Sequence, residues 1–442
     1  MLTLAAISAR SESKPDTASA IAARTDTTAA AEEQKASVAD VQGVQTDLEN
    51  YKFQVQRDRD LKTAQSTRSL LVTGVVQGRG GWTEARAAGA YHKHTAGEVA
   101  TALVGFSGNL YRDYRDARNL TYALRFVAAP SGGSAPVNLL DATVGYSLLR
   151  SLALEDQRLD VSFGQQQLPF GLEAQTTDEF KPVITNAQFV GALGLGPRQI
   201  GLIVRGDFLP RVDYGYNYRA PIIQYVLGVV NGNGQNATDD NDAKDVIGRL
   251  VLTIPSDYNS WLRQFAVGAT YYRGWANLSA LKPGATPAAA ATPAVVSLGD
   301  KIRTGVDVYY NHHPFGLNYE WVLGEDQFNP ATATVSNYTT GVRKSNGQVL
   351  TLFYNFGEQF LRGYRAQGRY DDWWPKSLQP FLRIDRWDPD IRAENNELDV
   401  YTAGVNFFFA ETSKLQFNYN RRVDNAKGAK LDDAQGQIQF GF

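Results

Sequence analysis

The 442-residue chain contains no cysteine and a single methionine. The absence of cysteine excludes disulfide bridges and cysteine-ligated zinc sites, and it suits a chain that folds in an oxidising compartment. No run of 18 or more residues is continuously apolar, so the sequence offers no transmembrane helix. Lysine and arginine number 44 against 46 aspartates and glutamates, which is far from the basic excess expected of a nucleic-acid-binding protein.

The common catalytic and metal-binding signatures are also missing. The sequence contains no GxSxG, HExxH or GxxxxGK[ST] motif. The four histidines form two pairs, His92 with His94 and His312 with His313, and neither pair has a third ligand in view. The acidic stretch 239–245 lacks the glycine and the final glutamate of a calcium loop. We therefore expect no enzyme, no cofactor and no bound metal.

Alternation of apolar and polar residues begins at Ser69 and continues to Phe442. Near the C-terminus, for example, Leu415 and Phe417 alternate with Gln416 and Asn418. A period of two residues predicts strands with one apolar face. Soluble sandwiches share this pattern, but an even number of such strands and many aromatics are typical of an outer-membrane barrel. The sixteen predicted strands are 69–82, 99–112, 119–129, 136–149, 157–167, 198–208, 211–231, 243–255, 261–275, 300–313, 314–326, 346–357, 377–388, 397–410, 413–425 and 434–442.

The predicted connections alternate between long and short, as the external loops and periplasmic turns of such a barrel do. Short turns are expected near 209–211, 256–260, 313–315 and 411–413. Long loops are expected at 83–98, 168–197, 232–242, 276–299, 327–345 and 426–433. The segment 358–376 is too long for its predicted periplasmic side. A loop as long as 168–197 can fold into a wide barrel, and we predict that it forms a constriction that carries Glu173, Asp178, Glu179 and Lys181.

Several segments between residues 161 and 274 have distinctive sequences: FGQQQLPFGLE, RQIGLIVRGDF, YVLGVVNGNG, KDVIGRLVLTIP and GATYYRG. They resemble the phosphate-selective porin O/P family of Gram-negative outer membranes. The alternation predicts an all-β fold, a 16-stranded antiparallel transmembrane β-barrel, and the resemblance implies a channel that forms a homotrimer in the outer membrane, where its partners are lipid and lipopolysaccharide. It also implies passage of small anionic or neutral solutes. The final strand, with Phe440 and Phe442, resembles the recognition signal of outer-membrane barrels.

Placing the apolar member of each alternating pair towards lipid puts a set of charged side chains inside the barrel. Arginine suits an anion pore because its planar guanidinium stays charged and binds carboxylate or phosphate oxygens. The alternative is that arginines and acids on adjacent strands pair with one another and only brace the wall. The predicted pore-lining residues are Arg125, Arg205, Arg249, Arg303, Arg383, Arg422, Asp141, Asp160, Asp307, Glu320 and Asp385.

The predicted constriction has an acidic balance of three carboxylates against Lys181, unless arginines of the wall converge on it. Tight phosphate capture needs several donors at one point. We therefore expect passive diffusion of small hydrophilic solutes with a mild anion preference, for phosphate-like ions or organic acids.

The first 68 residues have a different character. Residues 1–31 are rich in Ala, Thr and Ser and are expected to be a flexible tail or the remnant of a secretion signal. Residues 32–66 are predicted to form a helical coiled coil in the periplasm, before a barrel at 69–442. Its seam at spacings of three and four consists of Val41, Val44, Leu48, Tyr51 and Val55. A helix that lies against the barrel, or a frayed stalk, is the alternative. A second hypothesis for the whole protein is a structural anchor, in which this coil tethers the envelope through the cell wall or a surface layer.

Overall fold

The computed structural model describes residues 38–64, 68–87, 90–112, 118–129, 136–149, 154–214, 218–282, 292–312, 314–330, 339–357, 377–409 and 412–442, with Thr334, Ser336 and Asn337. Predicted segments 1–31 and 358–376 lie outside these residues. The strands are β1 (Leu71–Ala87), β2 (Ala90–Arg112), β3 (Asn119–Ala128), β4 (Val137–Ser147), β5 (Leu159–Gln166), β6 (Gln199–Asp213), β7 (Tyr218–Val230), β8 (Asp245–Thr253), β9 (Ala266–Lys282), β10 (Thr292–His312), β11 (Phe315–Phe328), β12 (Gly341–Tyr354), β13 (Phe356–Gly357), β14 (Ser377–Asp388), β15 (Leu398–Phe408), β16 (Lys414–Asp424) and β17 (Ala429–Gly441).

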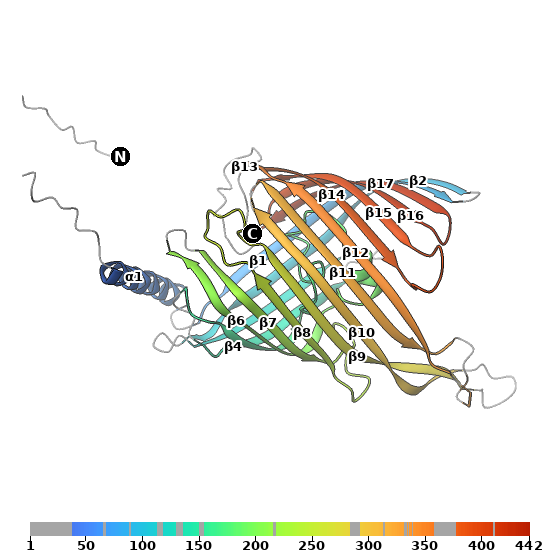
Figure 1. Cartoon of the computed structure of the whole chain (residues 1–442), viewed down its shortest axis with the longest axis horizontal. Coiled ribbons are helices and arrows are strands. Elements are labelled where there is room, and N and C mark those ends of the chain that lie inside the picture. The colour runs from blue at the N-terminus through green and yellow to red at the C-terminus, as the bar shows by residue number, and fades with distance from the viewer. Residues whose placement is uncertain are drawn as a thin grey trace, which may run out of the picture. The chain divides into compact units, whose positions relative to one another are not determined.

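The strands form one closed antiparallel sheet (Figure 1). Each strand pairs with its neighbours in the sequence, and β1 pairs with both β2 and β17, which closes the ring. The short β13 continues β12 past Asn355, and both pieces pair with β14. The wall therefore has sixteen strands, which confirms the strand number predicted from the alternation.

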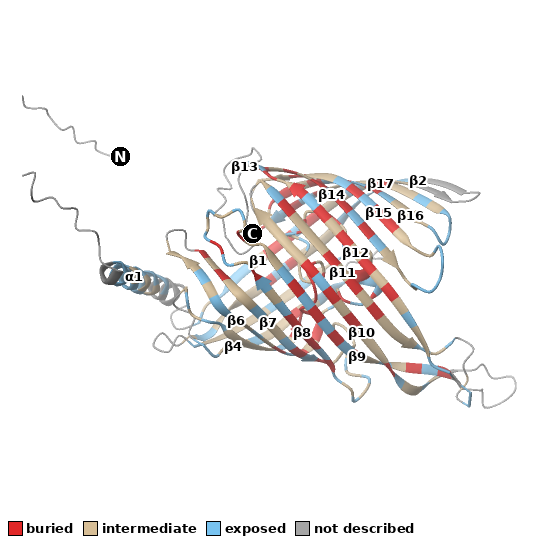
Figure 2. Cartoon of the chain, in the orientation of Figure 1, coloured by how far each residue is buried: buried red, intermediate tan, exposed pale blue. Residues whose placement is uncertain are grey.

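Burial along the strands is inverted relative to a soluble protein. On β14, Leu382 is 62% exposed and Ile384 51%, whereas Arg383 and Asp385 between and beside them are 4% and 2% exposed. A similar alternation of buried and more exposed positions runs along β8 and β16 (Figure 2). Exposed apolar and buried charged side chains suit a wall that is surrounded by lipid and encloses a polar interior.

Several predicted connections are wrong. The sheet continues through the long loops predicted at 83–98 and 276–299, where β1 pairs with β2 up to Ala87 and Ala90, and β9 pairs with β10 up to Lys282 and Thr292. Ladder hydrogen bonds do not require an apolar face, so strands that extend past the membrane lose the alternation but stay paired. Similarly, the short turn predicted at 256–260 is part of a longer connection between Thr253 and Ala266.

Two helices are described, α1 (Val38–Ala64) and the five-residue α2 (Gln188–Ala192). Helix α1 lies within the segment predicted to be helical, and its five seam residues are exposed in the single chain. The coiled coil stays a prediction. None of the described helices is long and apolar enough to cross a bilayer.

Candidate functional site

The connection between β5 and β6, residues 167–198, turns into the barrel and packs against the inner face of the wall. Phe170 and Phe189 of this loop have no exposed surface. They belong to an apolar cluster that includes Ile247 of β8, Val322 of β11 and Val349 of β12. Burying two phenylalanine side chains stabilises the loop by several kcal/mol, on the order of 1.5–3 kcal/mol for each ring. The loop is therefore a packed element of the barrel interior.

One turn of the loop wraps around a buried carboxylate. Glu320 of β11 accepts hydrogen bonds from the backbone nitrogens of Leu172 and Glu173, at 2.9 and 2.8 Å. The preceding Gly171 has φ +55°, and a Cβ atom there would overlap the Glu320 carboxylate. Glycine is thus required by both the backbone conformation and the close approach. The carboxylate of Glu320 is therefore bound by two backbone N–H groups and not by a cationic side chain of the described residues.

Arginines of the wall do converge on the acidic loop residues. Arg383 of β14 contacts Glu173 at 3.2 Å, and Arg125 of β3 contacts Glu179 at 3.1 Å. Arg125 also pairs with Asp141 at 3.4 Å. Because these arginines balance the loop carboxylates, the constriction does not carry the net acidic character of its own sequence.

The second half of the loop is held by further wall residues. Asp385 of β14 accepts a 2.9 Å hydrogen bond from the backbone nitrogen of Gln188, at the start of α2. Arg303 of β10 donates to the carbonyl oxygen of Leu193 at 3.4 Å and pairs with Asp326 at 2.7 Å. Thus Arg303 and Asp385 contact the loop and do not stand free in the interior.

Arg249 and Asp307 form a buried ion pair across the inner face of β9. The two guanidinium nitrogens of Arg249 donate to both Asp307 oxygens at 2.5 and 2.9 Å, and one of them also donates to Thr270 at 2.8 Å. This pair spans the space above Gly268, where a side chain would collide with both partners. The pair fits the alternative reading of the charged residues, in which they brace the wall.

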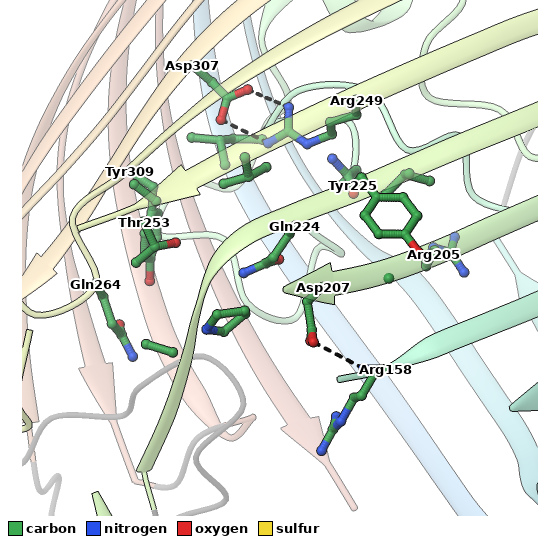
Figure 3. A pocket seen from close by; sticks show the side chains of 18 of the residues that line it. Arg158, Arg205, Asp207, Gln224, Tyr225, Arg249, Thr253, Gln264, Asp307 and Tyr309 are labelled. Atoms are coloured by element: carbon green, nitrogen blue, oxygen red, sulfur yellow. Dashed lines mark hydrogen bonds and ion pairs between the residues drawn. The ribbon is translucent and has the colours of Figure 1, made fainter. Parts of the chain in front are cut away.

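A cavity of about 460 Å³ lies between the loop and the wall from β5 to β10 (Figure 3). The loop contributes Gly171, Leu172 and Gln175 to its lining. Two of its arginines, Arg158 and Arg205, make no side-chain hydrogen bond or ion pair with the described residues. Arg205 stands opposite Asp160 in the β5–β6 register, whereas Arg219 is bound bidentately by Asp207 at 2.7 Å.

A second cavity, of about 180 Å³, lies between the loop and strands β1 to β4. Its charged lining residues are Arg125, Arg198, Asp178, Glu179 and Lys181. Arg198 pairs with Asp141 at 3.1 Å, and the largely buried Lys181 pairs with Asp178 at 3.3 Å. The charges around this cavity are therefore mutually neutralised, unlike those of the larger one.

The remaining predicted residues occupy defined positions. Asp160 accepts a 2.5 Å hydrogen bond from Ser147. Arg422 lies opposite Val400 on β15, and its Nε has no hydrogen-bond partner among the described residues. Phe440 and Phe442 are exposed, and Phe442 exchanges two backbone hydrogen bonds with Gly74 of β1.

The sequence analysis missed Arg158, Arg198 and Arg219, which complete the charged lining of the two cavities. Each lies at or beside a strand end, where alternation does not assign a face. For Arg158 and Arg198 the local signal is their place directly before β5 and β6, the strands that flank the constriction loop, whereas Arg219 lies at the start of β7. Within the described part of the chain, no group of three or more His, Cys, Asp or Glu residues could hold a metal ion.

The architecture is similar to that of solved bacterial porins. An anion-selective porin from Comamonas acidovorans is 12% identical, with a TM-score of 0.53 over 85% of this chain and 100% of that chain. The outer-membrane channel DcaP of Acinetobacter baumannii is 10% identical, with a TM-score of 0.51 over 85% of this chain and 97% of that chain. At these identities the likeness shows the fold.

The family comparison is more specific. No curated protein matches the chain by sequence. The sequence model of the family described as phosphate-selective porin O and P matches residues 93–442, from β2 to the last residue. This range contains the constriction loop, the wall arginines Arg125, Arg303 and Arg383 that bind it, and all the strands that line the larger cavity. The chain therefore belongs to the phosphate-selective porin O and P family.

Proposed function

We propose that the protein is an outer-membrane porin through which small hydrophilic solutes diffuse passively, with a mild preference for anions. The observation that carries the anion preference is the pair Arg158 and Arg205, which face the 460 Å³ cavity beside the constriction loop. Neither guanidinium is bound to a described acidic side chain within ion-pair distance. Such groups attract a passing anion without first having to break an internal ion pair.

The balance of charged residues around this cavity also supports a preference for anions over cations. Four arginines line it against three aspartates, namely Arg158, Arg205, Arg219 and Arg249 with Asp160, Asp207 and Asp307. Because Arg219 and Arg249 are each bound bidentately, their charges are largely compensated. A small surplus of positive charge biases diffusion, but it does not create a tight binding site. The proposal is thus a general pore for small anions, including phosphate and simple carboxylates.

We further propose what the outer face of the barrel contacts and how the barrel assembles. The exposed apolar belt on the outer face faces lipid and lipopolysaccharide, and the barrel assembles as a homotrimer. The seam on α1 supports the proposal of a coiled coil in the periplasm, since five apolar residues stay exposed on one chain. Tethering through this helix to the cell wall or a surface layer remains a prediction.

Liposome swelling with purified protein tests the transport proposal. We expect vesicles that contain the protein to admit small sugars and amino acids, with rates that fall as solute size increases. For the anion preference, the double variant Arg158→Gln/Arg205→Gln should slow the entry of a carboxylate relative to a neutral solute of equal size. Arg211→Gln is the matched control, because Arg211 is exposed and pairs with Asp257 outside the cavity lining. Protein-containing vesicles as impermeable as empty ones would contradict the proposal.

A further inference from the structure

A continuous series of side-chain hydrogen bonds crosses six neighbouring wall strands on the inner face. It begins at Arg79 of β1, which donates to Gln437 of β17 at 2.8 Å. From there each carboxamide donates to the next, with N–O distances between 2.7 and 3.2 Å. These five carboxamides, here called the amide belt, are Gln437 on β17, Gln416 on β16, Asn406 on β15, Gln379 on β14 and Asn355 at the end of β12.

The belt also binds the constriction loop at one short segment, residues 179–182. Gln416 donates to the carbonyl oxygens of Lys181 and Pro182, both at 3.2 Å. Asn406 donates to the Pro182 carbonyl oxygen at 2.9 Å. Beside the belt, Gln439 donates to the Glu179 carbonyl oxygen at 3.1 Å. Three neighbouring strands, β15, β16 and β17, therefore direct amide donors at the backbone carbonyls of Glu179, Lys181 and Pro182.

Lys414 adds a charged donor at the same place. Its ammonium group donates to the Lys181 carbonyl oxygen at 2.7 Å, and its side chain is 1% exposed. The described residues place no carboxylate within ion-pair distance of it, and the ring of Phe408 lies 5.8 Å from the nitrogen. Burying an ammonium without a carboxylate is costly. The neutral carbonyl of the loop and the ring beside it are the nearest partners of the ammonium group.

We propose that the amide belt and Lys414 form a latch that positions loop segment 179–182 and thereby fixes the width of the narrow passage beside it. Glu179 and Lys181 line the 180 Å³ cavity between the loop and β1–β4, so a displacement of this segment changes that space directly. Four of the five amides both donate and accept within this series, so the belt moves as a unit, because losing one member leaves its neighbours unsatisfied. The latch residues are positioning residues, and their effect on current rests on the proposed porin function.

Single-channel recording in planar bilayers tests the latch. Gln416→Leu and Lys414→Met each remove donors to the loop while keeping the side-chain volume close to the original. We expect an open-channel current that flickers, with noise several-fold above wild type, as a released loop segment moves in the passage. Asn420→Leu is the matched control, since Asn420 is also buried on β16 but, among the described residues, its side chain bonds to the wall residues Thr402 and Asp433 and not to the loop. Lys414→Arg retains a charged donor, so its open-channel noise should stay close to that of the wild type.

Hydrogen exchange of the peptide that spans residues 177–186 gives a second measurement, independent of any current. Exchange there should accelerate several-fold in Lys414→Met and stay at the wild-type rate in Asn420→Leu, with heat-modifiable migration confirming that each barrel is folded. Unchanged exchange in a folded Lys414→Met or Gln416→Leu variant, or an equal acceleration in the control, overturns the latch. If the wild-type protein conducts no ions, the proposed porin function is wrong. The latch is then judged from the hydrogen-exchange result alone.

Discussion

The backbone nitrogen of Leu172 donates a 2.9 Å hydrogen bond to the buried carboxylate of Glu320, which lies 148 residues later in the chain. The loop therefore depends on β11 for its conformation, and β11 depends on the loop to satisfy a carboxylate that forms no ion pair with any of the described residues. This mutual dependence extends around the interior, where Arg125, Arg383 and Lys414 contact the same loop from three other strands.

Removing the Glu320 carboxylate should loosen this turn. Glu320→Ala leaves the nitrogens of Leu172 and Glu173 without their acceptor, and each buried unpaired donor costs about 1–3 kcal/mol. We expect a lower urea midpoint of unfolding in detergent and a noisier open channel. Glu320→Gln keeps an acceptor oxygen of the same reach and should lose less stability. If alanine and glutamine have equal effects, the two hydrogen bonds do not hold the turn.

Breaking the Arg249–Asp307 pair should destabilise the barrel more than removing both charges. Arg249→Met leaves Asp307 buried and uncompensated, a change that typically costs about 3–5 kcal/mol. The double variant Arg249→Met/Asp307→Leu removes the uncompensated charge, and we expect its free energy of unfolding to lie closer to wild type. Urea unfolding followed by tryptophan fluorescence measures both. A double variant that is no more stable than the single one would contradict this account of the pair.

Asp160 should restrain the anion preference of the larger cavity. It lies opposite Arg205 in the β5–β6 register and lines the same space. Asp160→Asn removes a negative charge without changing the side-chain size, so the ratio of chloride to potassium permeability should rise by a few-fold. Asp257→Asn is the control, because Asp257 pairs with Arg211 and does not line the cavity. An unchanged ratio for Asp160→Asn would show that ions do not pass through this cavity, and a fall would contradict the expected effect of its charge.

The N-terminal helix should be dispensable for conductance. Deletion of residues 1–66 removes α1 but no strand of the wall, and we expect channels of wild-type conductance. If the seam forms a coiled coil, a peptide of residues 32–66 joined to a trimeric carrier should gain helicity, and Leu48→Asp should abolish the gain because it puts a charge in the seam. Reduced conductance of the deleted protein would show instead that α1 contributes to the channel.

The wall was predictable because lipid imposes a local rule on it. Each strand in contact with lipid must present apolar residues such as Leu382 and Ile384 at every second position, and this pattern is legible in the sequence. The rule ends where the lipid ends, which explains why the paired strands at 83–98 and 276–299 were mistaken for loops. There, cross-strand hydrogen bonds continue without an apolar face.

The interior was predictable only as a list of inward residues. Alternation places Arg249 and Arg383 on the inner face, but it cannot say that one braces the wall while the other binds the loop. The latch was missed for a similar reason: Gln416 and Asn406 look like ordinary polar positions of two strands. Their role arises from contacts with Pro182, more than 200 residues away in the sequence.

The reversal potential of the wild-type protein in a planar bilayer tests the central claim most directly. In a salt gradient of about tenfold in KCl, an anion-preferring pore gives a zero-current potential with the sign set by chloride. We predict that sign, at a magnitude well below that of a pore permeable to chloride alone, and a smaller potential for Arg158→Gln/Arg205→Gln. A potential with the sign set by potassium, or a folded protein that conducts no ions, would contradict the account.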